Sequence, residues 1–123
     1  MRGRRVENAP EGNRLLERQT LLEQELRRVV EALRGSGAQL IVLFGSAARG
    51  EIAPWSDLDI IVVLDSELSF IKRLGWLYER IQPRVGLDLL AYTPQEFEAI
   101  RQRPFIRQAM EEGKVLYEAR SNP

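Results

Sequence analysis

The chain has 123 residues, with 18 basic and 18 acidic side chains and neither histidine nor cysteine. This length fits one compact domain of about 100–150 residues. The absence of cysteine excludes disulfides and thiolate sites, and the absence of histidine excludes imidazole bases and serine–histidine triads. Any catalysis must therefore use carboxylates, hydroxyls, lysine or arginine, and any bound metal should be an oxygen-liking ion such as Mg²⁺.

The charge balance and the hydropathy pattern exclude two further classes of protein. A net charge of zero argues against a protein that coats DNA or RNA, so no direct nucleic-acid binding is expected. The longest apolar runs are far shorter than the roughly 20 residues of a membrane helix. No apolar stretch of the signal-peptide kind follows the basic start of the chain. We therefore expect a cytoplasmic protein without membrane contact.

The N-terminal third predicts a tail followed by one long helix. Residues 1–12 are polar and are expected to form a flexible tail, which leaves a single domain over residues 13–123. Apolar side chains recur at helical spacing over residues 13–34, with Asn13 as a candidate N-cap and a Gly-Ser-Gly stop at 35–37. The helix is long for so small a domain, so its first turns pack either on the domain's own core or on another chain.

The remainder of the chain alternates between predicted strands and helices. Apolar runs rich in β-forming residues indicate buried strands, and a capping-box pattern at residues 93–96 opens a short helix. We expect strands at 38–44, 57–64, 85–92 and 114–117, and helices at 67–82, 94–101 and 104–112. The region 45–56 is expected to be a loop with one helical turn. This order indicates a single domain of the α/β (α+β) class.

Five residues in and after this loop point to phosphate and metal chemistry. Gly45 and Ser46 follow a buried strand and offer free N–H groups and a hydroxyl that can hold a phosphate. Asp57 and Asp59 are two apart on a predicted strand, so both face one side with Cβ atoms roughly 7 Å apart. Such a pair can bridge two Mg²⁺ ions. Asp88 interrupts another apolar run, and a metal shared with the first two acids would satisfy its charge.

Each of these features also has a plain structural interpretation. A Gly-Ser pair is most often a turn, and an Asp-x-Asp run is most often a strand entry with solvated ends. The combination of both with flanking buried strands and a third acid favours a functional site.

One segment of the sequence resembles the signature of a known family. The run from Gly45-Ser-Ala-Ala-Arg-Gly to Ser-Asp57-Leu-Asp59 is similar to the signature of the minimal nucleotidyltransferases, within the DNA polymerase β-like superfamily. The similarity covers roughly residues 38–92. It implies a small nucleotidyltransferase core with a mixed sheet of about four strands flanked by helices. It also implies in-line transfer of a nucleoside monophosphate to a hydroxyl group.

The resemblance implies a role for each residue of the site. Gly45 and Ser46 would hold the β- and γ-phosphates of a nucleoside triphosphate, with ATP as the expected one. Asp57 and Asp59 would hold two Mg²⁺ ions, for which Mn²⁺ is a possible substitute. Asp88 would bind one of these ions and help to deprotonate the attacking hydroxyl. Arg49 would contact a phosphate or order the loop, and a surface arginine that braces the loop is the alternative.

The resemblance also implies a partner. Minimal nucleotidyltransferases typically pair with a HEPN-domain protein, as the antitoxin of an RNase toxin, and some modify that partner with AMP. Only about 31 residues follow Tyr92, so the acceptor site must be shallow or supplied by another chain, in a homo-oligomer or a hetero-oligomer. Two other interpretations stay open: an antitoxin that acts by binding alone, and a structural module with fortuitous acids.

Two tryptophans bear on the interaction with other molecules. Trp76 falls opposite the apolar stripe of the predicted helix 67–82, so it is either an interface anchor or covered by another segment. Trp55 precedes the first aspartate, where it either stacks on a base or partner or simply packs within the loop.

Overall fold

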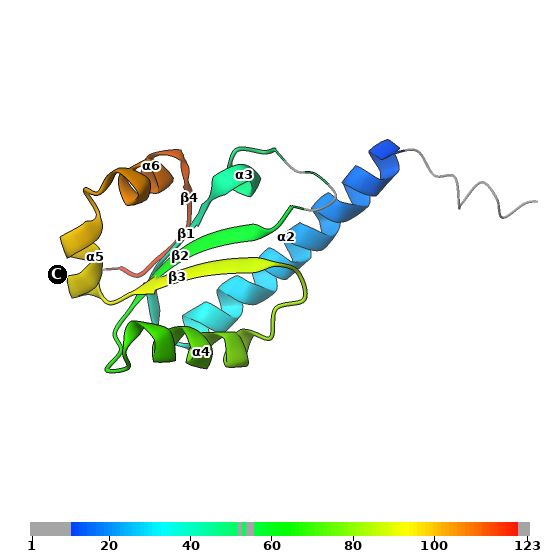
Figure 1. Ribbon diagram of the computed structural model, residues 1–123. Helices are drawn as coiled ribbons and strands as arrows, with labels where there is room; N and C mark the ends of the chain where they lie inside the picture. Colours follow the sequence, from blue (N-terminus) through cyan, green and yellow to red (C-terminus); the bar gives the residue numbers. More distant parts are fainter. Residues whose placement is uncertain (1–10, 52, 54–55, 121–123) are drawn as a thin grey trace, which may run out of the picture.

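A computed structural model of the protein describes residues 11–51, 53 and 56–120, with side chains from residue 14 onward. These residues form a four-stranded mixed sheet in the order β3-β2-β1-β4, with helices on both faces (Figure 1). The elements are α2 (Glu11–Gly35), β1 (Ala38–Phe44), α3 (Gly45–Ala48), β2 (Leu58–Leu64), α4 (Phe70–Ile81), β3 (Leu87–Tyr92), α5 (Pro94–Ile100), α6 (Pro104–Glu112) and β4 (Lys114–Glu118). The predicted fold class is confirmed.

The strand directions bring the predicted site residues to one end of the sheet. β1 runs antiparallel to both β2 and β4, whereas β2 and β3 run parallel. The C-terminal end of β1 therefore lies beside the N-terminal ends of β2 and β3. Phe44 is the register partner of Asp59, and Asp59 is the register partner of Asp88.

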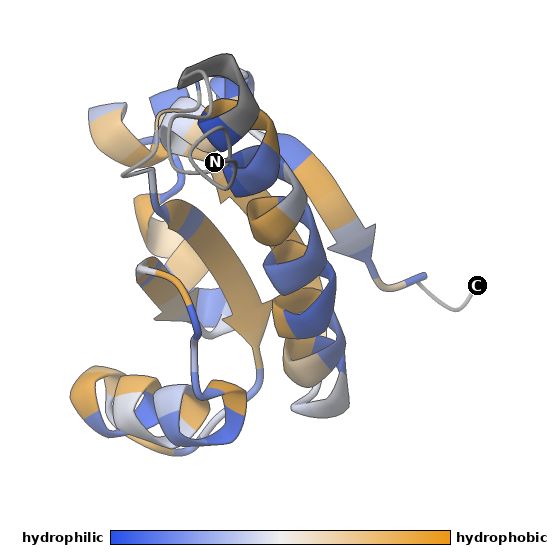
Figure 2. Ribbon diagram, turned by 90° about the vertical axis from the view of Figure 1, so that its right-hand side faces the viewer, coloured by the Kyte–Doolittle hydropathy of each residue, from blue (hydrophilic) through white to orange (hydrophobic). Residues whose placement is uncertain are grey.

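The sheet is covered on both faces, which explains why its strands are nearly continuous apolar runs. α2 and α4 pack on one face and α5 and α6 on the other, and Figure 2 shows the apolar strands between them. Along β2, Ile60 and Val62 belong to the α2/α4 core, whereas Ile61 and Val63 belong to the α5/α6 core. Because side chains alternate along a strand, Asp59 faces the α5/α6 side.

Two predicted helix starts are wrong. α2 begins at Glu11, so Asn13 lies inside the helix and is not its N-cap. Glutamate has a high helix propensity, which suits a helix that starts ahead of Asn13. α4 begins at Phe70 rather than at residue 67, because the side chain of Ser69 caps it by accepting a hydrogen bond from the Lys72 N–H. Residues 1–10 of the predicted tail lie outside the described residues.

Two strands begin later than predicted. β2 begins at Leu58 and β3 at Leu87, and the Leu58 N–H donates to the Gly86 carbonyl at 3.0 Å just ahead of β3. Asp57 therefore lies in the loop that enters the sheet. Elsewhere the capping box between Thr93 and Glu96 is confirmed. No helix in the described part of the chain is long and apolar enough to cross a membrane.

Candidate active site

Gly45 links β1 to α3 and lets a carboxylate lie against the start of that helix. Its φ of +74° lies in the left-handed region that favours glycine. A Cβ at this position would overlap the carboxylate of Asp59 on the neighbouring strand. The N-cap residue Phe44 provides no side-chain cap, and the first N–H groups of a helix have no acceptor within it. The turn at Gly45 and Ser46 can therefore donate to an anionic ligand beside Asp59.

Asp59 and Asp88 form a pair of acids across the parallel strands. The two residues are register partners, and their carboxyl groups share a hydrogen bond. Burial, this hydrogen bond and the charges of Asp88 and Asp57 raise the pKa of Asp59 to about 6, while Arg49 opposes the shift. The pair is thus a place where a positive charge would be stabilised.

Asp57 lies on the loop just before β2, with its carboxylate against Gly86. A Cβ at Gly86 would overlap this carboxylate, so glycine is needed there for close approach. The long helix α2 holds the loop in place, because Arg18 Nη2 donates to the Ser56 carbonyl at 2.6 Å. The hydroxyl of Ser56 in turn accepts a hydrogen bond from the Ala53 N–H at 2.7 Å.

The three aspartates provide oxygen ligands only, and this donor set fits a hard divalent ion such as Mg²⁺. Asp59 is the register partner of Asp88 and follows Asp57 by two residues, and both of these acids raise the pKa of Asp59. Among the residues that the structure describes, however, no three acidic side chains are grouped so that they hold an ion as they stand. The carboxylate of Asp57 would have to leave Gly86 and turn toward the pair.

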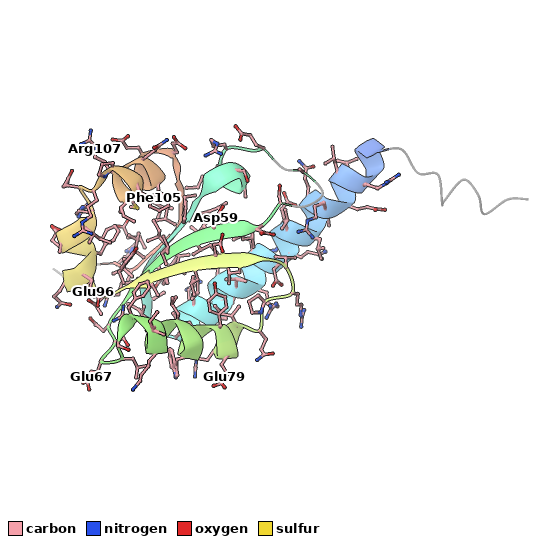
Figure 3. All side chains as sticks on the ribbon, in the orientation of Figure 1. Asp59, Glu67, Glu79, Glu96, Phe105 and Arg107 are labelled. Carbon is pink, nitrogen blue, oxygen red and sulfur yellow. The ribbon has the colours of Figure 1, made fainter. Side chains whose placement is uncertain are left out.

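Two hollows flank the acidic pair on the α5/α6 side of the sheet. The first has a volume of about 500 Å³ and contains Asp59, Asp88 and Tyr78 in its lining. The second has a volume of about 200 Å³ and lies over Gly45 and Arg49. Phe44 and Phe105 line both hollows, and Figure 3 shows Asp59 and Phe105 on the same side of the sheet. The acids and the glycine turn thus open onto one continuous surface.

Sequence reasoning missed the aromatic side chains around the site. The Phe105 ring is 61% exposed and packs edge-on against Phe44, with ring centroids 5.9 Å apart. Tyr78 reaches the first hollow from α4 and holds the edge of β3 through its hydroxyl. The sequence does contain a signal for Phe105, because this aromatic residue directly follows the proline that opens the predicted helix 104–112. The position of Tyr78 had no local signal, because its spacing matches an ordinary core-facing residue.

Arg49 braces the loop. Its guanidinium donates to Glu51 at 3.2 Å and to Glu112 of α6 at 3.1 Å. Hydrogen bonds from Gln108 and from Arg49 lower the pKa of Glu112. The loop-ordering interpretation is therefore the one that the contacts support, and a phosphate contact of Arg49 stays a prediction.

Of the two tryptophans, Trp76 is described by the structure and makes none of these contacts. The side chain of Trp76 is 38% exposed, and the Arg80 guanidinium lies 4.5 Å from the centroid of its ring. Part of the ring is therefore covered by a residue of its own helix, and an interface role stays a prediction. Trp55 lies outside the described residues.

Comparison with known proteins identifies the family of the chain. The nucleotidyltransferase domain family matches residues 23–117. The chain therefore belongs to the nucleotidyltransferase domain family. A protein of Methanocaldococcus jannaschii named "Putative protein adenylyltransferase MJ0604" is 31% identical over 100 residues, which cover 77% of this chain and 97% of that protein.

Solved structures share the fold. A crystal structure described as "a putative nucleotidyltransferase from Sulfolobus solfataricus" has a TM-score of 0.61 at 20% identity, over 85% of this chain and 87% of that one. A crystal structure of a toxin–antitoxin complex with AMP-PNP has a TM-score of 0.52 at 26% identity, over 76% of this chain and 73% of that one. The resemblance to nucleotidyltransferases is confirmed, and the protein is an enzyme of this class.

Proposed function

We propose that the protein transfers AMP from ATP to a hydroxyl group of a HEPN-type toxin, its partner protein, in a Mg²⁺-dependent reaction. The observation that carries the proposal is the pairing of Asp88 with Asp59, whose carboxylate lies directly against the glycine turn of α3. This arrangement places acids that attract cations beside N–H groups that attract phosphate. Nucleotidyl transfer needs both, because the substrate is a metal-bound triphosphate.

Each residue of the site has a task in this reaction. The N–H groups of Gly45 and Ser46 and the Ser46 hydroxyl donate to the β- and γ-phosphate oxygens. Asp57, Asp59 and Asp88 would hold two divalent ions, Mg²⁺ or Mn²⁺, which when bound would supply charge neutralisation for the attacking and leaving oxygens. Asp88 accepts the proton of the attacking hydroxyl as the new O–P bond forms at the α-phosphorus. The bond to pyrophosphate breaks at the same time, and pyrophosphate leaves.

The choice of a protein acceptor is supported by relatives and by the shape of the site. The M. jannaschii relative is named for protein adenylylation, and one structural neighbour is a toxin–antitoxin complex with an ATP analogue. Asp88 is exposed at the hollow that contains Phe105, so a hydroxyl on another macromolecule can reach it. The proposed assembly is thus a hetero-oligomer of this protein with its toxin.

A labelling experiment tests the proposal. The protein, a HEPN partner, Mg²⁺ and ATP labelled at the α-phosphate are combined, and label on the partner is measured for wild type and for Asp57→Ala plus Asp59→Ala. We expect label on the partner with wild type only, and removal of Mg²⁺ with EDTA should abolish it. If neither protein transfers label and the double variant neutralises the toxin as well as wild type, the protein acts as an antitoxin by binding alone.

A further inference from the structure

Among the strands that the structure describes, β3 lies at the edge of the sheet, so one side of its backbone has no partner strand there. In a parallel pair, the N–H and C=O groups of one residue point to the neighbouring strand and those of the next residue point away. The Leu58 N–H donates to the Gly86 carbonyl at 3.0 Å, so the backbone groups of Gly86 point to β2. Because the direction alternates, the backbone groups of Asp88 point to β2 as well. The backbone groups of Leu87 and Leu89 therefore face the free edge.

The hydroxyl of Tyr78 occupies this free edge. It donates to the Leu87 carbonyl at 2.6 Å and accepts from the Leu89 N–H at 3.1 Å. These are the two outward-facing groups on either side of Asp88. One side chain from α4 thus makes the two hydrogen bonds that a neighbouring strand would otherwise make at this position.

We propose that Tyr78 is a positioning residue for Asp88. Tyr78 holds the backbone on both sides of this aspartate, and so sets the direction in which the carboxylate enters the hollow of about 500 Å³. The inference rests on the proposed function, in which Asp88 binds a metal ion and accepts the proton of the attacking hydroxyl.

The position of Asp88 needs such support. β3 begins only at Leu87, so Asp88 is the second residue of an edge strand, where strands fray. Its side chain is exposed, whereas the opposing Asp59 is half-buried in the more central strand β2. A group that binds metal must be held within about 0.5 Å of its productive place. The Tyr78 hydroxyl restrains the backbone that carries it.

The test compares Tyr78→Phe with Tyr92→Phe. Both variants keep the aromatic ring and remove one hydroxyl, and Tyr92 lies on the same strand. Among the described residues, no hydrogen bond links the Tyr92 hydroxyl to a backbone group of β3. Four quantities are measured at a temperature well below unfolding: kcat for labelling of the partner, KM for ATP, affinity for Mn²⁺, and the hydrogen-exchange rate of the Leu89 amide.

We expect Tyr78→Phe to lower kcat and Mn²⁺ affinity by about tenfold or more, as is usual when a group that orients a metal ligand is lost. KM for ATP should stay within about twofold, because the turn at Gly45 is untouched, and the Leu89 amide should exchange faster. Tyr92→Phe should match wild type in all four. A role in stability alone would make the Leu89 amide of Tyr78→Phe exchange faster and leave kcat and Mn²⁺ affinity unchanged, and this result would overturn the inference.

Failure of the proposed function gives a different result. In that case wild type itself transfers no label and binds no Mn²⁺, and the positioning role falls with it. If wild type is active and Tyr78→Phe keeps its kcat and Mn²⁺ affinity, the proposed function stands and only the role of Tyr78 is wrong.

Discussion

Asp59 bears a charge that the folded protein disfavours when no cation is bound. Burial and the neighbouring Asp88 raise its pKa from 3.8 to about 6. The folded state therefore holds this proton more tightly than the unfolded chain does. The contribution of this group to stability is fully present below about pH 4, declines as the pH rises toward 6, and is lost above that.

Asp59→Asn should accordingly stabilise the metal-free protein at neutral pH. We expect the free energy of unfolding at pH 7.5 to rise by about 1–3 kcal/mol, since each pKa unit corresponds to roughly 1.4 kcal/mol. The gain should be smaller at pH 4.5. Urea unfolding at both pH values measures it, with the exposed Glu67→Gln as control. An Asp59→Asn variant that is less stable than wild type at pH 7.5 would contradict this account.

Alanine variants at Gly45 and Gly50 distinguish the cost of a left-handed backbone from the effect of overlap with the Asp59 carboxylate. Both have positive φ, +74° and +77°. A Cβ at Gly45 would overlap Asp59, whereas a Cβ at Gly50 would meet nothing within 4 Å. Alanine at either position should cost about 1–2 kcal/mol of stability from the left-handed backbone. Only Gly45→Ala should also abolish label transfer in the assay described above. Equal activity of the two variants would show that the contact with Asp59 is not needed.

At the scale of elements, a buried arginine joins α4 to β3 and α5. The side chain of Arg73 is only 2% exposed and forms a bidentate ion pair with Glu96, at 2.7 and 3.1 Å. It also donates to the carbonyls of Ala91 and Leu68. Hydrogen bonds from Arg73 and from the Thr93 backbone lower the pKa of Glu96. One side chain thus fixes the helix that carries Tyr78 relative to the strand that carries Asp88.

Arg73→Met should destabilise the protein by about 2–4 kcal/mol, because the buried Ala91 carbonyl, the Leu68 carbonyl and the Glu96 carboxylate lose their donor. The expected loss of stability is smaller than the largest losses for fully buried ion pairs, because 42% of the Glu96 side chain is exposed and remains solvated. The matched control is Arg101→Met, which removes an exposed ion pair with Glu98 and should change stability by less than about 0.5 kcal/mol. Urea unfolding of both variants measures the difference, and equal losses would be inconsistent with the role given to Arg73.

At the scale of the whole molecule, one end of the sheet gathers residues from distant parts of the chain. The glycine turn follows β1, Asp59 is the second residue of β2 and Asp88 is the second residue of β3. β1 runs opposite to the other two strands, so its end meets their beginnings. A ligand that binds the turn and the acids together would link three strands and so stabilise the entire fold.

Mg²⁺ with ATP should therefore raise the melting temperature. At a ligand concentration 100 times Kd the gain is about 2.7 kcal/mol, or very roughly 10 °C for a domain of this size. Asp57→Ala plus Asp59→Ala should show little or no shift under the same conditions. A thermal unfolding scan with and without the ligand checks this, and an equal shift in both proteins would place the ligand elsewhere.

Local sequence patterns predicted most of the elements and the residues of the candidate site. Apolar runs identified the strands because both faces of the sheet are covered. The capping box at Thr93 correctly located the start of α5 at Pro94. Helix starts at Glu11 and Phe70 were missed because several polar residues near each start can serve as a cap. Which of these polar residues caps the helix depends on packing against distant parts of the chain.

The sequence alone determined the chemistry available to this protein: acids and hydroxyls without histidine or cysteine, a Gly-Ser pair after an apolar run, and three aspartates at or near the predicted strands. Only the tertiary structure decided that Asp59 pairs with Asp88, that Arg49 braces α6, and that Tyr78 and Phe105 line the hollow at the site. The physical reason is that spacing along a chain records which side chains share a face of one element. Contacts between elements depend on strand order and direction, which a single sequence does not encode locally.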